Sequence, residues 1–430
     1  MDETIFALAS GLGRAAIAVM RISGPGSRAA LAALAGPALP PPRRASLRRL
    51  RDGAGTVLDH ALLLWLPGPR TYTGEDASEL HLHGGRAVIE AVAAALVAQG
   101  LRPAEPGEFS RRAFLNGRMD LIEAEAVQDL VAAETEEQRR QALRQLEGAL
   151  GDLYQGWSDR LRRILAYQEA LIDFPDEDLP PEVEADLLRT MQAVRQEITD
   201  HLADAGRGEK LREGLFAAIT GPPNVGKSSL VNALADRDVA IVSPIPGTTR
   251  DALEARVVLG GVPVTLVDTA GLREAADVIE AEGIRRAHAS VEKADIVIAM
   301  VTAGDSAPVD PPDDRRLLVA NKADLGGTGP DGAIRISVLT GEGMPLLRDC
   351  LAAKARVLTE SLGPPPLTRA RHRASLQDAL ERLTAAERAT LPELRGEDLR
   401  LAMRALGRIT GQVGVEDILD TLFRQFCIGK

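Results

Sequence analysis

Residues 221–228 constrain the fold more than any other part of the sequence. They are Gly-Pro-Pro-Asn-Val-Gly-Lys-Ser, which fits the phosphate-loop pattern of a glycine, four variable residues and Gly-Lys-Ser/Thr. The apolar run 215–219 predicts a buried strand before the loop, and 230–234 predicts a helix after it. This context favours a nucleotide site over a glycine-rich turn matched by chance, because backbone N–H groups and the helix N-terminus then face phosphate.

The end of this loop supplies a charge and a metal ligand. We expect Lys227 to reach the outer phosphates and the Ser228 hydroxyl to ligate Mg²⁺. The loop residues expected at the nucleotide are Asn224, Val225, Gly226, Lys227, Ser228 and Ser229.

A second motif, Asp268-Thr269-Ala270-Gly271, ends the apolar run 262–267. We expect Asp268 to hold Mg²⁺ through water and the Gly271 N–H to meet the γ-phosphate. The pattern is common by itself, but its position after a phosphate loop makes it specific.

A third motif, Asn321-Lys322-Ala323-Asp324, selects the base. The Asp324 carboxylate only accepts hydrogen bonds, and guanine offers it two adjacent donors that adenine lacks. We expect Asn321 to bridge the base to the phosphate loop and the Lys322 stem to cover the base. A polar turn is the alternative, disfavoured because all three motifs occur in order. The strand and turn that follow are expected to contact the guanine oxygen through Ser337, Val338 and Leu339.

The loop 243–251 lies between the first two motifs and contains Thr249, the candidate for a second hydroxyl on Mg²⁺. The alternative is an inert surface loop. Leu272 follows the second motif where many GTPases place a water-orienting Gln, so hydrolysis needs another group. The acidic candidates are Glu274, Asp277, Glu280 and Glu282, and the candidates for positive charge are Arg250, Arg273 and a bound monovalent cation.

Motifs spread over the whole chain narrow the class of GTPase. The last four residues are Cys-Ile-Gly-Lys, and the N-terminal part contains Arg-Ile-Ser-Gly at 21–24, Thr-Gly-Glu-Asp at 73–76 and Pro-Gly-Glu-Phe-Ser at 106–110. Together with Asn224 and the sequences at 113–117, 247–251 and 268–274, these motifs resemble the MnmE (TrmE) family of tRNA-modification GTPases.

This resemblance implies potassium-dependent hydrolysis. Asn224 matches a side-chain ligand of K⁺, and Glu280 matches the family's catalytic, water-orienting Glu. A K⁺ ion would take the place of an arginine finger and neutralise developing charge, which leaves Arg250 and Arg273 as loop anchors. The matching cation loop comprises Ser243, Pro244, Ile245, Pro246, Gly247 and Thr248, of which Ser243 and Ile245 offer backbone carbonyls and Thr248 completes the shell.

The resemblance also implies an N-terminal domain that binds 5-formyl- or 5,10-methylene-tetrahydrofolate. Arg118 stands where Lys is usual, and the planar guanidinium differs from a point charge. For Cys427 the alternatives are a small buried hydrophobe or, by resemblance, a role near the folate and the modification chemistry. The positions matching the family's folate contacts are Arg21, Glu79, Arg118 and Lys430.

The implied partners are a second copy of the chain, bound through the N-terminal domain, an FAD-dependent protein in a heterotetramer, and tRNA modified at C5 of its wobble uridine. The alternatives are an Era-like ribosome-assembly GTPase and a non-catalytic GTP-binding scaffold. A ribosome-assembly GTPase would carry a basic RNA module after the GTPase domain, whereas this chain continues in helices.

Composition and charge indicate the cellular compartment and the kinds of partner that the chain can bind. Two cysteines and no basic, apolar N-terminal segment favour a cytoplasmic protein, and no apolar run approaches the about 18–20 residues that span a bilayer. The net charge of −11 disfavours broad non-specific binding to nucleic acid. The basic residues at 369–373 favour a solvated face over an RNA contact.

A chain of 430 residues exceeds a single core, and we expect α/β, α+β and all-α parts. Asp120 with Glu123 predicts a capped start for the helical part. The expected segments are an α+β folate-binding and dimerisation domain at 1–118, a helical segment at 119–212, an inserted doubly wound Ras-like GTPase domain at 213–360, and a second helical segment at 361–430.

Overall fold

The computed structural model describes residues 3–11, 13–173, 181–235, 254–268, 289–305, 313–361, 363–413, 419, 422–424, 426 and 429. The chain divides into two compact units, Met1–Gln128 with Leu406–Lys430, and Asp129–Ala405. This division differs from the four expected segments, whose boundaries stay a prediction. Within the described residues, no helix has the length and apolarity needed to cross a membrane.

The first unit contains a six-stranded mixed sheet, ordered β3-β4-β5-β2-β1-β6. Helices α1 and α2 cover one face, because alternate residues such as Leu63 and Leu80 point there and are fully buried. The elements are β1 (Ile5–Leu8), β2 (Ala15–Ser23), α1 (Ser27–Ala35), β3 (Ser46–Arg51), β4 (Val57–Leu66), β5 (Ala77–Gly84), α2 (Arg86–Ala98), β6 (Arg102–Pro103), α3 (Glu108–Leu115) and α4 (Leu121–Ala132).

The opposite face of this sheet exposes apolar side chains. Leu47 pairs with Leu62 across β3 and β4, and Leu62 pairs with His81 on β5, so the three share one face. Leu47 is 67% exposed and Ile17, on β2, is 58% exposed. This open sheet face therefore presents apolar surface to solvent.

The start of α4 has the predicted cap. The Glu123 N–H donates to the Asp120 carboxylate at 2.7 Å, and the Asp120 N–H donates to the Glu123 carboxylate at 2.7 Å. The capping prediction is confirmed. Near the chain end, Phe423 and Phe426 pack with Leu121 in a small separate cluster.

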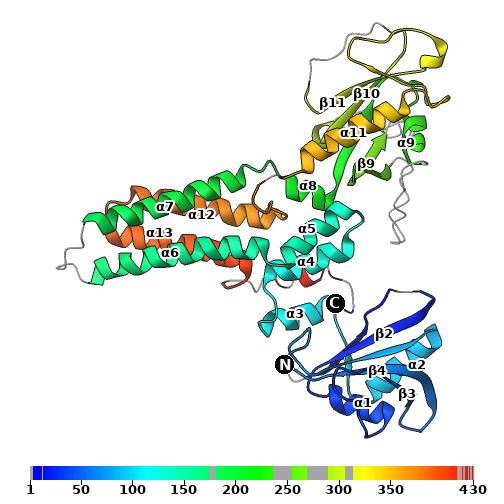
Figure 1. The fold of residues 1–430 in the computed structure, drawn as a ribbon, viewed down its shortest axis with the longest axis vertical. Coiled ribbons are helices and arrows are strands. Elements are labelled where there is room, and N and C mark those ends of the chain that lie inside the picture. The colour runs from blue at the N-terminus through cyan, green and yellow to red at the C-terminus, as the bar shows by residue number, and fades with distance from the viewer. Residues whose placement is uncertain are drawn as a thin grey trace, which may run out of the picture. The chain divides into compact units, whose positions relative to one another are not determined.

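The second unit contains four long helices that lie side by side, α6, α7, α12 and α13 (Figure 1). The GTPase motifs occupy the sequence between α8 and α12, so this part is an insertion in a helical fold. The helices are α5 (Glu136–Leu146), α6 (Ala149–Asp173), α7 (Pro181–Leu202), α8 (Arg207–Glu213), α12 (Ala370–Arg388) and α13 (Pro392–Thr410).

A buried aromatic cluster fills the middle of these helices. Trp157 and Tyr154 from α6 pack against His201 from α7, with the Trp157 and His201 ring centroids 5.5 Å apart. His372 from α12 is fully buried beside them. The interpretation of 369–373 as a solvated face is therefore wrong, because His372 faces this core.

Burial lowers the pKa of His201 to about 4. The His201 imidazole therefore takes up a proton near pH 6.5 in the unfolded chain but only near pH 4 in the folded chain. As a result, the free energy of unfolding decreases as pH falls from 6.5 toward 4. We expect a loss of about 3 kcal/mol across that window. Fluorescence of Trp157 during urea titration, with Trp65 replaced by Phe, measures it. His201→Gln should remove most of this pH dependence, whereas His60→Gln, at an exposed site, should leave it unchanged. A urea midpoint of the parent chain that does not change with pH would contradict the prediction.

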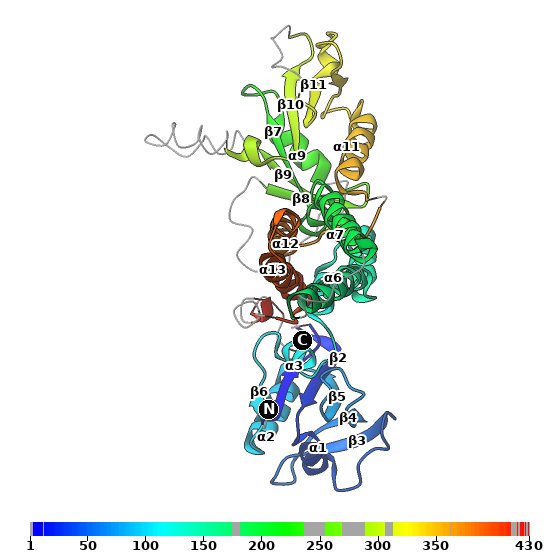
Figure 2. The ribbon, with the colours of Figure 1, turned by 90° about the vertical axis from the view of Figure 1, so that its left-hand side faces the viewer.

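The inserted part is a second six-stranded sheet, ordered β12-β11-β10-β7-β9-β8. All neighbouring strands are parallel except β8 and β9, which form a hairpin. Helices α9 and α11 pack on one face, and α11 is seen beside the sheet in Figure 2. The elements are β7 (Leu215–Thr220), α9 (Lys227–Ala235), β8 (Glu254–Leu259), β9 (Val262–Asp268), β10 (Ile296–Thr302), β11 (Arg316–Asn321), η1 (Ala323–Leu325), β12 (Ile334–Arg335) and α11 (Met344–Thr359). The expected combination of α/β, α+β and all-α parts is confirmed.

Candidate nucleotide-binding site

The phosphate loop connects β7 to α9, as the sequence predicts. Gly221 and Gly226 have φ angles of +143° and +100°, which favour glycine, and Asn224 has a φ of +60°. The Lys227 ammonium donates hydrogen bonds to the carbonyls of Gly221 at 3.0 Å and Pro222 at 2.7 Å. The lysine is thus held over the loop, where outer phosphates would compete for its protons.

The predicted metal-binding groups meet beside this loop. The Ser228 hydroxyl donates to the Asp268 carboxylate at 2.5 Å, and Asp268 is 1% exposed at the end of β9. Two convergent oxygen groups suit Mg²⁺, which completes its shell with water and phosphate oxygens. Among the described residues, no group of three His, Cys, Asp or Glu side chains could hold a metal ion.

The base-selecting motif follows β11 and joins the phosphate loop. The Asn321 amide donates to the Val225 carbonyl at 2.8 Å, and the Val338 N–H donates to the Asn321 side-chain oxygen at 3.2 Å. Asp324 lies exposed on η1, and Lys322 has a φ of +66°. Asn321 therefore connects its own motif with the phosphate loop and with the turn at 337–339. The Asp324 carboxylate stays accessible to a base.

The remaining residues of the predicted nucleotide site divide into two groups. Ser229 lies on α9, Ala323 on η1, and Ser337 is buried in the turn where Leu339 is 88% exposed. The following predicted residues lie outside the described residues: Ser243, Pro244, Ile245, Pro246, Gly247, Thr248, Thr249, Thr269, Ala270, Gly271, Glu280, Cys427 and Lys430.

Gly226→Ala tests the close approach of this loop to Asn321. A Cβ at position 226 would lie 2.4 Å from the Asn321 amide nitrogen, and the φ of +100° adds strain. We expect GTP affinity to fall about 10- to 100-fold, which corresponds to the 1–3 kcal/mol of a strained backbone. Fluorescent-nucleotide titration measures this. Gly304→Ala is the control, because Gly304 has a similar φ of +107° and open space around it. Equal effects of both variants would refute the steric explanation.

Three of the candidate folate residues are described. The Arg21 guanidinium donates to the Glu79 carboxylate at 3.0 and 3.1 Å and stacks near the ring of Tyr72, 5.4 Å away. Arg21 and Glu79 are cross-strand partners on the open sheet face. Arg118 is exposed, and its stem lies beside Gly74. The structure thus pairs Arg21 with Glu79, so a pterin would compete for that carboxylate.

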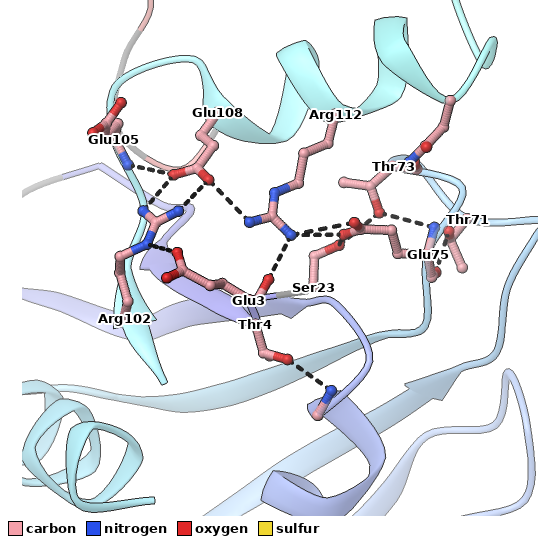
Figure 3. Close-up of polar contacts among 12 residues, drawn as sticks. Glu3, Thr4, Ser23, Thr71, Thr73, Glu75, Arg102, Glu105, Glu108 and Arg112 are labelled. Atoms are coloured by element: carbon pink, nitrogen blue, oxygen red, sulfur yellow. Dashed lines mark hydrogen bonds and ion pairs between the residues drawn. The ribbon is translucent and has the colours of Figure 1, made fainter. Parts of the chain in front are cut away.

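Sequence reasoning gave no role to the carboxylates of the Thr-Gly-Glu-Asp and Pro-Gly-Glu-Phe-Ser motifs. Figure 3 shows Glu75 and Glu108 converging on Arg112, which is 1% exposed and donates to Glu75 at 3.2 Å and Glu108 at 3.0 Å. Glu108 also accepts from Arg102 at 2.7 Å. Burial opposes its charge, but the hydrogen bonds from Arg102, the Glu105 N–H and Arg112 hold the pKa of Glu108 down to about 2. We call these four side chains the N-terminal ion network.

Comparison with known proteins decides the family. The family model described as the GTP-binding protein TrmE N-terminus matches residues 4–118, and that for the MnmE helical domain matches residues 121–427. The chain belongs to the MnmE family. It is a GTP hydrolase that takes part in tRNA modification, and membership over the whole length favours this activity over ribosome assembly.

Close relatives extend over the whole chain. The "tRNA modification GTPase MnmE" of Gluconacetobacter diazotrophicus is 64% identical over 99% of this chain and 98% of its own length. The protein of the same description from Granulibacter bethesdensis is 57% identical over 100% of both chains. A solved structure of Aquifex aeolicus Era bound to GDP and AlF₄⁻ is 25% identical over 41% of this chain and 69% of its own, with a TM-score of 0.27.

Proposed function

We propose that the chain hydrolyses GTP in a potassium-dependent manner and, with an FAD-dependent partner protein, modifies the wobble uridine of tRNA at C5 with a one-carbon unit from tetrahydrofolate. The observation that carries the GTPase part is the meeting of the phosphate loop, Asp268 and the Asn321–Asp324 motif at one end of a parallel sheet. Family membership supports the tRNA part. We place the reaction in the cytoplasm, where tRNA is modified.

The proposed hydrolysis uses two cations. Ser228 and Thr249 would hold Mg²⁺, with Asp268 acting through water, and the ion would neutralise phosphate charge. The Asn224 side chain and the loop at 243–248 would hold K⁺, which would supply the charge that an arginine finger supplies elsewhere. Because Leu272 cannot orient water, Glu280 does so. Asn224 is the non-glycine residue of the loop that adopts a positive φ, +60°.

The proposed folate site and dimer contact lie on the open sheet face. Arg21 and Glu79 supply a cation and an acceptor for a pterin and its glutamate tail, with Tyr72 beside them. A second copy of the chain would cover exposed apolar residues such as Leu47 and Ile17. Arg118, Lys430 and Cys427 complete the proposed folate site and its chemistry.

Turnover in KCl against NaCl tests the proposed mechanism. We expect GTP hydrolysis to be at least about tenfold faster in KCl, because the cation stabilises charge in the transition state. Glu280→Ala should abolish turnover while leaving GTP affinity unchanged, which also separates an enzyme from a non-catalytic scaffold. Glu274→Ala, a nearby carboxylate, is the matched control. Equal turnover in both salts would overturn the potassium proposal.

A further inference from the structure

A cavity of about 510 Å³ lies within the second unit, between helix α5, helix α8, the β8–β9 hairpin and the end of α11. Part of its wall is apolar, formed by Leu150, Leu211 and Val262. Its volume falls in the range of about 300–1,000 Å³ typical of small-ligand sites. None of the groups assigned to GTP or folate lines it.

Helix α5 directs a row of glutamines toward this region. Gln138 and Gln141 donate hydrogen bonds to backbone carbonyls of α8 at 3.0–3.1 Å. Gln145 follows at helical spacing on the same face, lines the cavity and is 3% exposed. Neither polar atom of its amide has a hydrogen-bond partner among the described residues. Gln138 and Gln141 therefore bind α8, whereas the Gln145 amide makes no hydrogen bond within the described residues.

A second buried polar group without a hydrogen-bond partner among the described residues lies in the segment after α11. Thr368 lines the same cavity, is 1% exposed, and its hydroxyl has no hydrogen-bond partner among the described residues. Buried amides and hydroxyls are normally satisfied by protein, water or ligand. Because Gln145 already lines the cavity, a rotation of its flexible side chain would bring the amide to a bound molecule.

The lining of the cavity carries charges of both signs: Arg140, Arg144 and Arg356 lie there with Glu137 and Glu360. Arg144 and Arg356 are exposed, and neither forms an ion pair within the described residues. Arg140 also lines it but is paired with Glu136 at 2.8 Å. Guanidinium groups free of a carboxylate suit a phosphate, which they bind in a bidentate manner.

We propose that this cavity binds a nucleotide unit, separate from the GTP site. The Gln145 amide offers a donor beside an acceptor, which pairs with the hydrogen-bonding edge of a base. Thr368 bonds the base or ribose, the apolar wall covers the base, and Arg144 and Arg356 bind the phosphate. The unit is either a free nucleotide or a nucleotide of bound tRNA, which present the same groups.

Calorimetric titration of UMP into the GDP-saturated full chain tests the proposal, since GDP keeps the GTP site occupied. We expect UMP to bind, and Gln145→Leu to weaken it at least tenfold. Gln196→Leu is the matched control, because Gln196 is an exposed glutamine that bonds Asp200 on α7. Arg144→Gln with Arg356→Gln should weaken UMP and ribose 5-phosphate but leave uridine unchanged.

Thermal unfolding separates a ligand role from a structural one. Replacing an unpartnered buried amide by an apolar group of similar shape is neutral or stabilising, so Gln145→Leu should keep or raise the Tm of the GDP-bound chain. Competition between tRNA and UMP would assign the site to an RNA nucleotide, and its absence to a free nucleotide. Absence of UMP binding, or equal binding by Gln145→Leu, would overturn the proposal and leave a cavity that holds only water.

Discussion

Asp324→Asn should lower GTP affinity by about 10⁴-fold, the size of effect seen when a site built to bond a polar edge loses its complement. The carboxylate accepts from two adjacent donors of guanine, and an amide would present a donor against one of them. Because xanthine carries a carbonyl where guanine carries its amine, the variant should prefer XTP. Competition of GTP and XTP against a fluorescent nucleotide measures both changes.

Asp331→Asn is the matched control for this prediction. Asp331 is another exposed carboxylate seven residues along the same connection, and we expect its replacement to leave GTP affinity unchanged. If Asp324→Asn bound GTP within twofold of the parent, the base would have to be identified by other groups. Asn321 would then be the next candidate, because it connects the phosphate loop with the turn at 337–339.

Arg112→Met should destabilise the N-terminal domain by about 3–5 kcal/mol, because it leaves the mostly buried Glu75 carboxylate without its cation and leaves Glu108 with Arg102 alone. Arg112 is almost completely buried and bonds Glu75, Glu108 and the backbone carbonyl of Glu3. Trp65 lies in this domain and the only other tryptophan is Trp157, so Trp157→Phe makes fluorescence report on the domain alone. Urea unfolding followed at Trp65 gives the free energy.

Two further variants make the result interpretable. Arg86→Ala removes an exposed ion pair with Glu90 and should leave the unfolding midpoint unchanged. Adding Glu75→Gln to Arg112→Met should recover part of the loss, since the uncompensated charge is then gone, while Glu108 keeps its ion pair with Arg102. A midpoint unaffected by Arg112→Met would show that the ion network contributes nothing to stability.

The nucleotide site was largely predictable because its motifs encode local backbone geometry. A glycine-rich loop between an apolar strand and a helix specifies the phosphate loop, and parallel strands bring Asp268 and Asn321 to the same edge. The strand and turn expected after the third motif are both present: β12 contains Ile334 and Arg335, and the turn that follows donates the Val338 N–H to Asn321.

The N-terminal ion network was not predictable from spacing. Its members lie on α3, before β5 and on β6, and only the folded sheet brings Glu75 near Arg112. The same holds for His372, whose basic neighbours suggested a solvated face. Arg373 forms ion pairs with Asp204 and Glu209. The His372 ring packs edge-on against Tyr154. Charge clusters in a sequence carry no information about which partners the fold supplies.

The β8–β9 hairpin has a mechanical consequence. Gly260 and Gly261 form its two-residue turn with φ angles of +62° and +87°, and the space beside Gly261 is occupied by the Glu137 carboxylate of α5. Arg256 on β8 is paired with Glu134 at 2.9 Å. Because β9 ends at Asp268, the hairpin connects that carboxylate, through one short strand, to helix α5 and the residues before it. A substitution in this turn is therefore expected to disturb packing at both ends of β9.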